Sequence, residues 1–175
     1  GDVYKRQERA KLSKRHGAVA VEEFRDRGYL PQALLNFIAL LGWNPGDDRE
    51  VLSLEEMVDE FRFERVSKSG AVFDREKLNW MNQQYLLKLP EEEYFRMIDD
   101  VIQKGDYHDQ DPGKIRQAAE ILKTRLVTLS DLNQKLGLFF EENPEIKDLQ
   151  AIEVLKEEKS KTVLKEFLQQ VENLD

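Results

Sequence analysis

Hydrophobic side chains recur at spacings of three and four along most of the chain, which is the period of an α-helix. The most apolar stretch covers residues 31–42 and carries six large aliphatic or aromatic side chains, so we expect a largely buried helix there. Pro31 suits the first turn of that helix, and Gly28 suits the position after a short helix that starts at Val21. The periodic part of the chain is therefore predicted to begin with two helices.

Two further helix starts are marked by side chains that can cap a helix N-terminus. Ser53 and Glu56 have the spacing of a capping box ahead of the stretch LEEMVDEF, and Asp74 is a suitable N-cap for a helix over residues 75–89. We interpret the apolar stripe that begins at Leu78 in this second helix as core. Between the two helices, residues 63–73 surround a glycine turn and predict short extended segments or a small hairpin.

Pro90 interrupts the periodic pattern and is the predicted domain boundary. Beyond it the chain is helical in character, with helices over 91–104 and 114–126 and a third capped by Ser130. A last helical stretch starts near residue 149, where Ser160 is a candidate cap for a second helix. The pattern therefore predicts a mainly α fold with at most a small β element, and a helical bundle after Pro90.

Composition excludes several classes of protein. Of the 175 residues, 40% are hydrophobic and 35% are charged, which is typical of a soluble globular chain, and no apolar run is long enough to span a membrane. The chain has no cysteine, which excludes disulfides and thiolate chemistry and suits the cytoplasm. His16 and His108 lie far apart without ligand-spaced partners, so we expect no metal site.

Positive charge gathers at the start of this acidic chain. The first 15 residues carry six basic and two acidic side chains, against a net charge of −8 for the whole chain. Within them, the stretch KLSKR places Lys11 and Lys14 three residues apart around Ser13, with Arg15 next to it. Such a loop can hold a polyphosphate through ammonium groups, a hydroxyl and backbone N–H groups. An ordinary solvated loop is the alternative interpretation.

Several ordered blocks give the chain a recognisable likeness. KLSKRHGAVAV, GYLPQALLNFIALLGWNPGD, SLEEMVDEF and ERVSKSGAVFDREKLNWMNQQY follow one another over residues 8 to about 89. In order and spacing they resemble bacterial-type glutamyl-tRNA synthetases, and the likeness continues more loosely to the C-terminus. KLSKR is similar to the second signature of class I synthetases, the lysine-serine-lysine loop.

The resemblance implies three regions. Residues 1–17 would be the end of the catalytic domain with the KLSKR loop, 18–90 a stem-contact region, and 91–175 the first part of a helical anticodon-binding domain. The family's Rossmann domain carries a histidine-isoleucine-glycine-histidine type signature that does not occur in these residues. We therefore expect the chain by itself not to make glutamyl-tRNA.

The resemblance also implies roles for single residues. Lys11, Ser13, Lys14 and Arg15 would bind ATP, with Lys14 the catalytic contact to phosphate. Lys77 and Trp80 would face the inner side of the tRNA, although core packing of Trp80 is an open alternative. Arg125 would read the third anticodon base, since an arginine can donate in a fork to a base edge. Its alternative is a helix-surface arginine with a carboxylate neighbour.

The family's partners are ATP with Mg²⁺, glutamate and tRNA(Glu), which implies a cytoplasmic, monomeric enzyme without a membrane partner. Two relatives fit less well: the paralogue that glutamylates queuosine lacks a helical anticodon domain, and glutaminyl-type enzymes use β-barrels there. A stand-alone helical module that binds tRNA or protein without catalysis is the alternative function.

Overall fold

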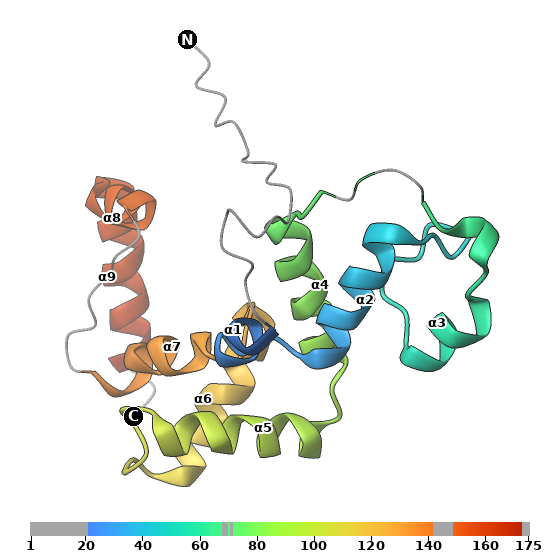
Figure 1. Cartoon of the computed structure of the whole chain (residues 1–175). Coiled ribbons are helices and arrows are strands. Elements are labelled where there is room, and N and C mark those ends of the chain that lie inside the picture. Colours follow the sequence, from blue (N-terminus) through green and yellow to red (C-terminus); the bar gives the residue numbers. More distant parts are fainter. Residues whose placement is uncertain (1–20, 68–69, 71, 142–148, 173–175) are drawn as a thin grey trace. The chain divides into compact units, whose positions relative to one another are not determined.

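The computed structural model describes residues 21–67, 70, 72–141 and 149–172, and these residues are mainly helical (Figure 1). The chain divides after Phe140 into two compact units. The elements of the first unit are α1 (Val21–Asp26), α2 (Pro31–Gly42), α3 (Leu54–Glu60), the 3₁₀ turn η1 (Phe63–Arg65), α4 (Arg75–Lys88), α5 (Glu91–Lys104), α6 (Pro112–Leu122), the 3₁₀ turn η2 (Lys123–Arg125) and α7 (Asp131–Phe140). Those of the second are α8 (Leu149–Lys156) and α9 (Glu158–Glu172). The mainly α fold is confirmed.

Local sequence signals place several helix boundaries where they were predicted. Pro31 opens α2, and Gly28 has a positive φ of 77° in the turn before it. The Ser53 side chain accepts from the Glu56 N–H while Glu56 accepts from the Ser53 N–H, so the capping box is present. Asp74 caps α4 by accepting from the N–H of Lys77. Each signal acts within one helical turn, which is why the sequence alone predicts it.

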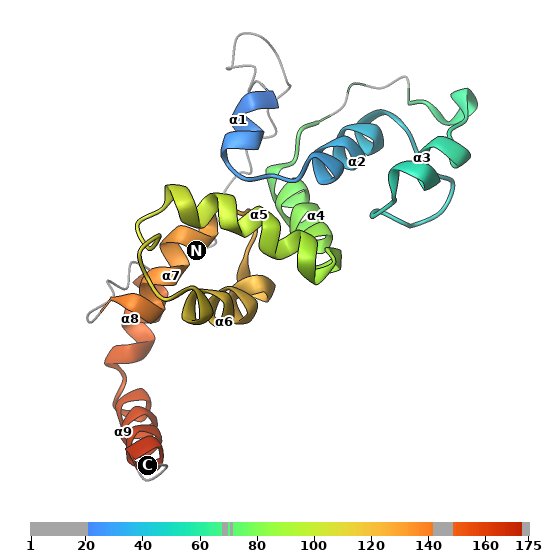
Figure 2. The same cartoon turned by 90° about the horizontal axis from the view of Figure 1, so that it is seen from below.

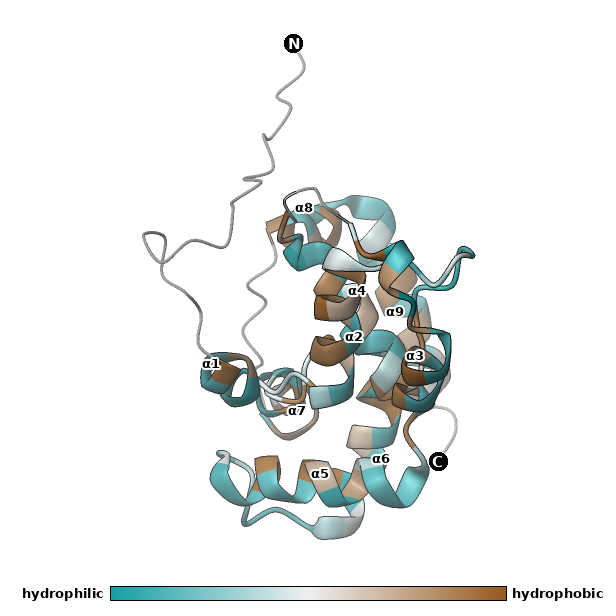
Figure 3. Ribbon diagram, turned by 45° about the vertical axis from the view of Figure 1, so that its right-hand side comes forward, coloured by the Kyte–Doolittle hydropathy of each residue, from teal (hydrophilic) through white to brown (hydrophobic). Residues whose placement is uncertain are grey.

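The helices α2 and α4 lie side by side in both views of the cartoon and share an aromatic and aliphatic core (Figure 2). Brown, hydrophobic segments alternate with teal ones on both helices (Figure 3). The buried side chains of this core are Phe24, Tyr29, Leu34, Phe37, Leu78 and Met81. The apolar stripe of α4 is thus core, as predicted.

A second core lies among α5, α6 and α7 and reaches back across Pro90. Leu30, Ala33 and Leu86, which precede the predicted boundary, pack in one cluster with Tyr94 and Leu132, which follow it. Gly28 also approaches the chain before α7, because an added Cβ would lie 2.6 Å from the backbone nitrogen of Ser130. The α1–α2 turn is therefore anchored on the bundle. The predicted domain boundaries, at 17 and 90, stay predictions.

Of the two alternatives predicted for residues 63–73, short extended segments or a small hairpin, the described residues show a short extended segment and no hairpin. Residues 63–65 form the 3₁₀ turn η1, and Val66 makes an isolated antiparallel bridge with Trp43. The N–H of Ser67 donates to the carbonyl of Gly42 at 2.8 Å. The extended segment therefore pairs with the end of α2, where Trp43 is buried, and within the described residues it does not pair across its own glycine turn.

The second unit consists of two helices, α8 and α9, in the part that the structure describes. The chain breaks into two helices there, as predicted, but α9 begins at Glu158, so Ser160 lies inside the helix and the prediction of a cap at Ser160 is wrong. Large apolar side chains of this unit stay exposed, among them Phe167 at 60%. No described helix is both long and apolar enough to cross a membrane.

Candidate nucleic-acid interface

The four residues proposed to bind ATP lie outside the described residues. Lys11, Ser13, Lys14 and Arg15 therefore keep the roles that the resemblance implies, as predictions. Among the residues that are described, no group of three or more histidine, aspartate or glutamate side chains is placed to hold a metal ion.

Helix α4 presents Trp80 on the side opposite its buried stripe, whereas Lys77 lies at the edge of that stripe, beside α2. Its core face is fixed by Leu78 and Met81, which are fully buried, so the intervening residue Trp80 points outward and is 42% exposed. The interpretation of Trp80 as a core residue is therefore wrong. Lys77 lies one turn earlier and forms an ion pair with Glu50, from the loop before α3.

Arg125 lies in the 3₁₀ turn η2, directly after α6, and is exposed. Its guanidinium makes no ion pair or hydrogen bond to the part of the chain that the structure describes. The described residues therefore do not support the alternative, in which Arg125 is a surface arginine with a carboxylate neighbour. Five donors of Arg125 are left available to a ligand.

Helix α4 holds the turn that bears Arg125. The side-chain nitrogen of Gln83 donates to the carbonyl of Thr124 at 3.1 Å, and the ammonium of Lys123 donates to the carbonyl of Leu89 at 3.0 Å. Trp80 precedes Gln83 by three residues, so both lie on neighbouring parts of one helix face. The outward side of α4 and the turn η2 therefore form one surface, which we call the α4–η2 surface.

The two elements that form this surface are basic, although the chain as a whole is acidic. Helix α4 and turn η2 together carry five basic side chains and one acidic one, in a chain whose net charge is −8. The basic residues are Arg75, Lys77, Lys88, Lys123 and Arg125. A basic surface that also exposes a tryptophan can bind RNA through phosphate contacts and stacking.

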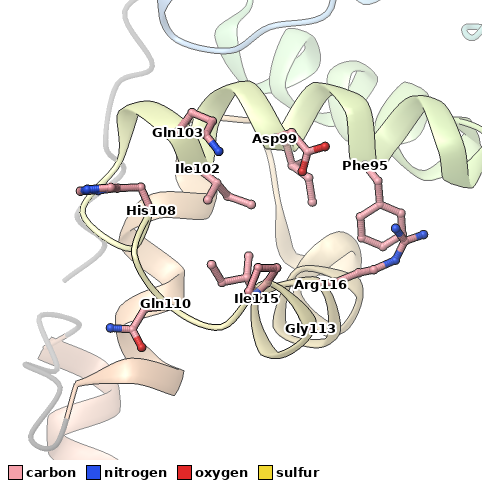
Figure 4. Close-up of a pocket in the computed structure, with 11 residues that line it drawn as sticks. Phe95, Asp99, Ile102, Gln103, His108, Gln110, Gly113, Ile115 and Arg116 are labelled. Atoms are coloured by element: carbon pink, nitrogen blue, oxygen red, sulfur yellow. The ribbon is translucent and has the colours of Figure 1, made fainter.

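A cavity of about 330 Å³ between α5 and α6 is another candidate site (Figure 4). Phe95, Ile98 and Ile115 line it with apolar surface, and Asp99 lies on its rim, while the Arg116 guanidinium stacks 3.7 Å over the Phe95 ring. Residues 99–111, which bound it on one side, carry five aspartates and one lysine. The cavity lining itself carries one acidic side chain, Asp99, and one basic one, Arg116, and so offers phosphate no cluster of cations; we do not include it in the RNA-binding candidate.

Sequence reasoning missed a buried asparagine that holds the candidate site together. Asn82 is fully buried in α4; its Oδ1 accepts from the N–H of Leu30 at 2.8 Å, and its Nδ2 donates to the carbonyl of Val127 at 2.6 Å. One side chain thus joins the start of α2, α4 and the segment after η2. Its signal in the sequence is a polar residue inside the apolar stripe of a helix.

A second buried polar group, Asn36, ties α2 to the loop before α3. Its Oδ1 accepts from the N–H of Leu52 at 3.0 Å and lies 2.8 Å from the hydroxyl of Tyr85, which also contacts the carbonyl of Leu52. Burial, and secondarily the charge of Glu56, raises the pKa of Tyr85 to about 12. Tyr85 therefore stays protonated at neutral pH and acts as a hydrogen-bond donor between α4 and α2.

Two family models match the chain and together define its class. The model described as the catalytic domain of class I tRNA synthetases (E and Q) matches residues 3–80, and the model described as the anticodon binding domain matches residues 78–175. The class of protein that the helical fold and these two matches define is therefore a class I tRNA synthetase.

Individual relatives narrow the class. The chain is 41% identical to glutamate–tRNA ligase 1 of Syntrophomonas wolfei over 168 residues, which cover 95% of this chain and 34% of the relative. It is 44% identical to glutamate–tRNA ligase 1 of Pseudothermotoga lettingae over 137 residues, 78% of this chain and 29% of that relative. The chain belongs to the glutamate–tRNA ligase family, as the resemblance predicted.

Solved structures agree with this family. The crystal structure of a glutamate tRNA ligase from Elizabethkingia meningosepticum, in complex with its amino acid, matches with a TM-score of 0.62 and 31% identity, over 87% of this chain and 30% of that one. The glutamate–tRNA synthetase of Elizabethkingia anophelis matches with a TM-score of 0.61 and 34% identity, over 74% of this chain and 26% of that one. The chain thus spans about a third of the length of the relatives it matches.

Proposed function

We propose that this chain is the part of a glutamate–tRNA ligase that binds tRNA(Glu) and contacts the phosphates of ATP. The single observation that carries the proposal is the basic α4–η2 surface, with exposed Trp80 and Arg125, in a chain of this family. The reaction would run in two steps. The carboxylate of glutamate attacks the α-phosphate of ATP and releases pyrophosphate, and the terminal ribose hydroxyl of tRNA then attacks the acyl carbon and releases AMP.

In the first step, the KLSKR loop would follow the charge that grows on the departing pyrophosphate. Lys14 would touch these oxygens, and Lys11, Ser13 and Arg15 would complete the loop. Cationic donors aimed at developing negative charge lower the activation barrier because they interact more strongly with the transition state than with the ground state. Mg²⁺ bound to the ATP would neutralise phosphate charge in the same step.

In the second step, the α4–η2 surface would hold the tRNA in register. The ammonium of Lys77 suits a phosphate, the exposed indole of Trp80 suits a ribose or base face, and Arg125 suits the edge of the third anticodon base. We further propose that the ligase is cytoplasmic and monomeric; the absence of cysteine from the chain supports the reducing compartment.

The proposal is tested by aminoacylation with a ligase that contains this chain. We expect glutamate to become attached to tRNA(Glu) in a reaction that needs ATP and releases AMP and pyrophosphate. A ligase that attached another amino acid, or that charged no tRNA under these conditions, would contradict the proposal.

Arg125→Gln is expected to relax selection at the third anticodon base by about tenfold, because a glutamine cannot present the forked pair of donors that arginine does. The measurement is kcat/KM for tRNAs that differ only at that base. Arg62→Gln is the matched control, since Arg62 is also exposed but bonds to the backbone carbonyls of Asp59 and Phe61. Equal selectivity of the Arg125 variant and the unchanged ligase would refute the role of Arg125.

Glu50→Gln is expected to tighten RNA binding by about two- to fivefold. Lys77 is paired with Glu50, and a phosphate has to displace that carboxylate before it can bind the ammonium. Glu91→Gln is the control with the same change of charge, since Glu91 pairs with Arg116 beside the α5–α6 cavity. The measurement is the dissociation constant at fixed salt. Identical effects of the two variants would show that only net charge matters.

A further inference from the structure

We propose that Gln83 is a positioning residue that sets the direction in which Arg125 meets the RNA. The inference rests on the proposed function and assigns to α4 a part in anticodon selection, beyond its own contacts to the tRNA. Gln83 is half-buried in α4, and its side-chain nitrogen donates to the carbonyl of Thr124, the residue directly before Arg125.

The turn that bears Arg125 is weakly held by its own backbone. Within η2, the closing hydrogen bond from the N–H of Leu126 to the carbonyl of Lys123 is 3.4 Å long, at the outer limit for such a bond. A 3₁₀ turn has poor hydrogen-bond geometry even when it is well formed. Side chains from outside the turn therefore have to fix its orientation.

Three side-chain hydrogen bonds supply that fixation, two donated from α4 and one donated by Lys123 of the turn itself, and they act at different places along the turn. Below the turn, Leu126 is fully buried and Asn82 binds the carbonyl of Val127. At its start, the Lys123 ammonium binds the carbonyl of Leu89 and lies 4.9 Å over the Tyr94 ring. Gln83 is the only one of the three whose bond reaches the middle of the turn, among the contacts of the described residues.

The position of this bond suits it to control the direction of the Arg125 side chain and not the stability of the fold. A single bond between a half-buried side chain and a carbonyl contributes about 1 kcal/mol to folding, so its loss leaves the fold intact. Recognition of a base edge by a guanidinium, in contrast, depends on the direction of two parallel donors. A small rotation of Thr124 would turn Arg125 away from that direction. Loss of Gln83 should therefore cost selectivity more than affinity.

The adjacent residue offers a matched control. Gln84 follows Gln83 on α4 and is also half-buried, and its side chain makes no hydrogen bond to the described residues. Gln83→Met and Gln84→Met both keep the length of the side chain and remove its amide. The two variants thus differ in whether the bond to Thr124 is lost.

The experiment measures binding of the chain to two anticodon stem-loop RNAs, one with the third anticodon base of tRNA(Glu) and one with that base replaced. We expect Q83M to lower the ratio of the two affinities by about three- to tenfold and Q84M to keep it, with the same unfolding midpoint in both. An unchanged ratio in Q83M, or an equal loss in Q84M, would overturn the positioning role alone. Absence of RNA binding by the unaltered chain would instead refute the proposed function, and this role with it.

Discussion

Replacing Asn82 with alanine is expected to lower the free energy of unfolding by about 3 kcal/mol. The change removes two hydrogen bonds and leaves the N–H of Leu30 and the carbonyl of Val127 without their partner in the interior. Each buried polar group left unsatisfied costs about 1–3 kcal/mol. Because these groups belong to the start of α2 and to the segment after η2, the loss should loosen both from α4. Denaturant unfolding followed by circular dichroism measures the effect.

Gln84→Ala is the control for Asn82→Ala, since it shortens another polar side chain of α4 without removing a bond to the described residues. We expect that control to change stability by less than about 0.5 kcal/mol. A loss below about 1 kcal/mol for Asn82→Ala would mean that water or a rearranged backbone replaces both bonds, and that Asn82 does not hold the three segments together.

Replacing Lys14 with alanine, in a ligase that contains this chain, is expected to slow formation of glutamyl-adenylate by about 10²-fold or more. The proposed contact of this ammonium with the departing pyrophosphate exists mainly in the transition state, and removal of one such donor typically costs 10²–10³ in rate. The measurement is glutamate-dependent exchange of pyrophosphate into ATP. Affinity for tRNA and the unfolding midpoint should stay unchanged, because the proposed contact is to ATP alone.

Lys5→Ala is the matched control, because Lys5 belongs to the same basic segment but lies outside KLSKR. If both lysine variants lose the same small factor, the segment acts only through its net positive charge. If the Lys14 variant activates glutamate as fast as the unaltered ligase, the proposed role of Lys14 is wrong.

The sequence predicts those parts of the fold that depend on neighbouring residues. Pro31, the Ser53–Glu56 box and Asp74 each act within one helical turn, so the starts of α2, α3 and α4 could be predicted without knowledge of the tertiary structure. The ordered blocks around KLSKR and EKLNW likewise predicted the family, since they are read along the chain and need no contacts.

The parts that could not be predicted depend on contacts between distant residues. Val66 bridges to Trp43 because backbone groups at the end of α2 have no partner within the helix. A search for a local hairpin does not consider such a distant partner. The sequence leaves core packing of Trp80 open, because the orientation of α4 is decided by the contacts of Leu78 and Met81 to distant residues. The bond from Gln83 to Thr124 spans 41 positions and leaves no periodic signal.

Hydrogen–deuterium exchange of the chain, with and without a tRNA(Glu) transcript, tests most directly that the α4–η2 surface is the RNA-binding part of this ligase. We predict slower exchange over residues 75–88 and 123–127 when the RNA is bound, and an effect that weakens steeply as salt is raised. Residues 99–111, beside the α5–α6 cavity, should exchange at the same rate in both states. Protection at residues 99–111 with none on the α4–η2 surface would contradict the account.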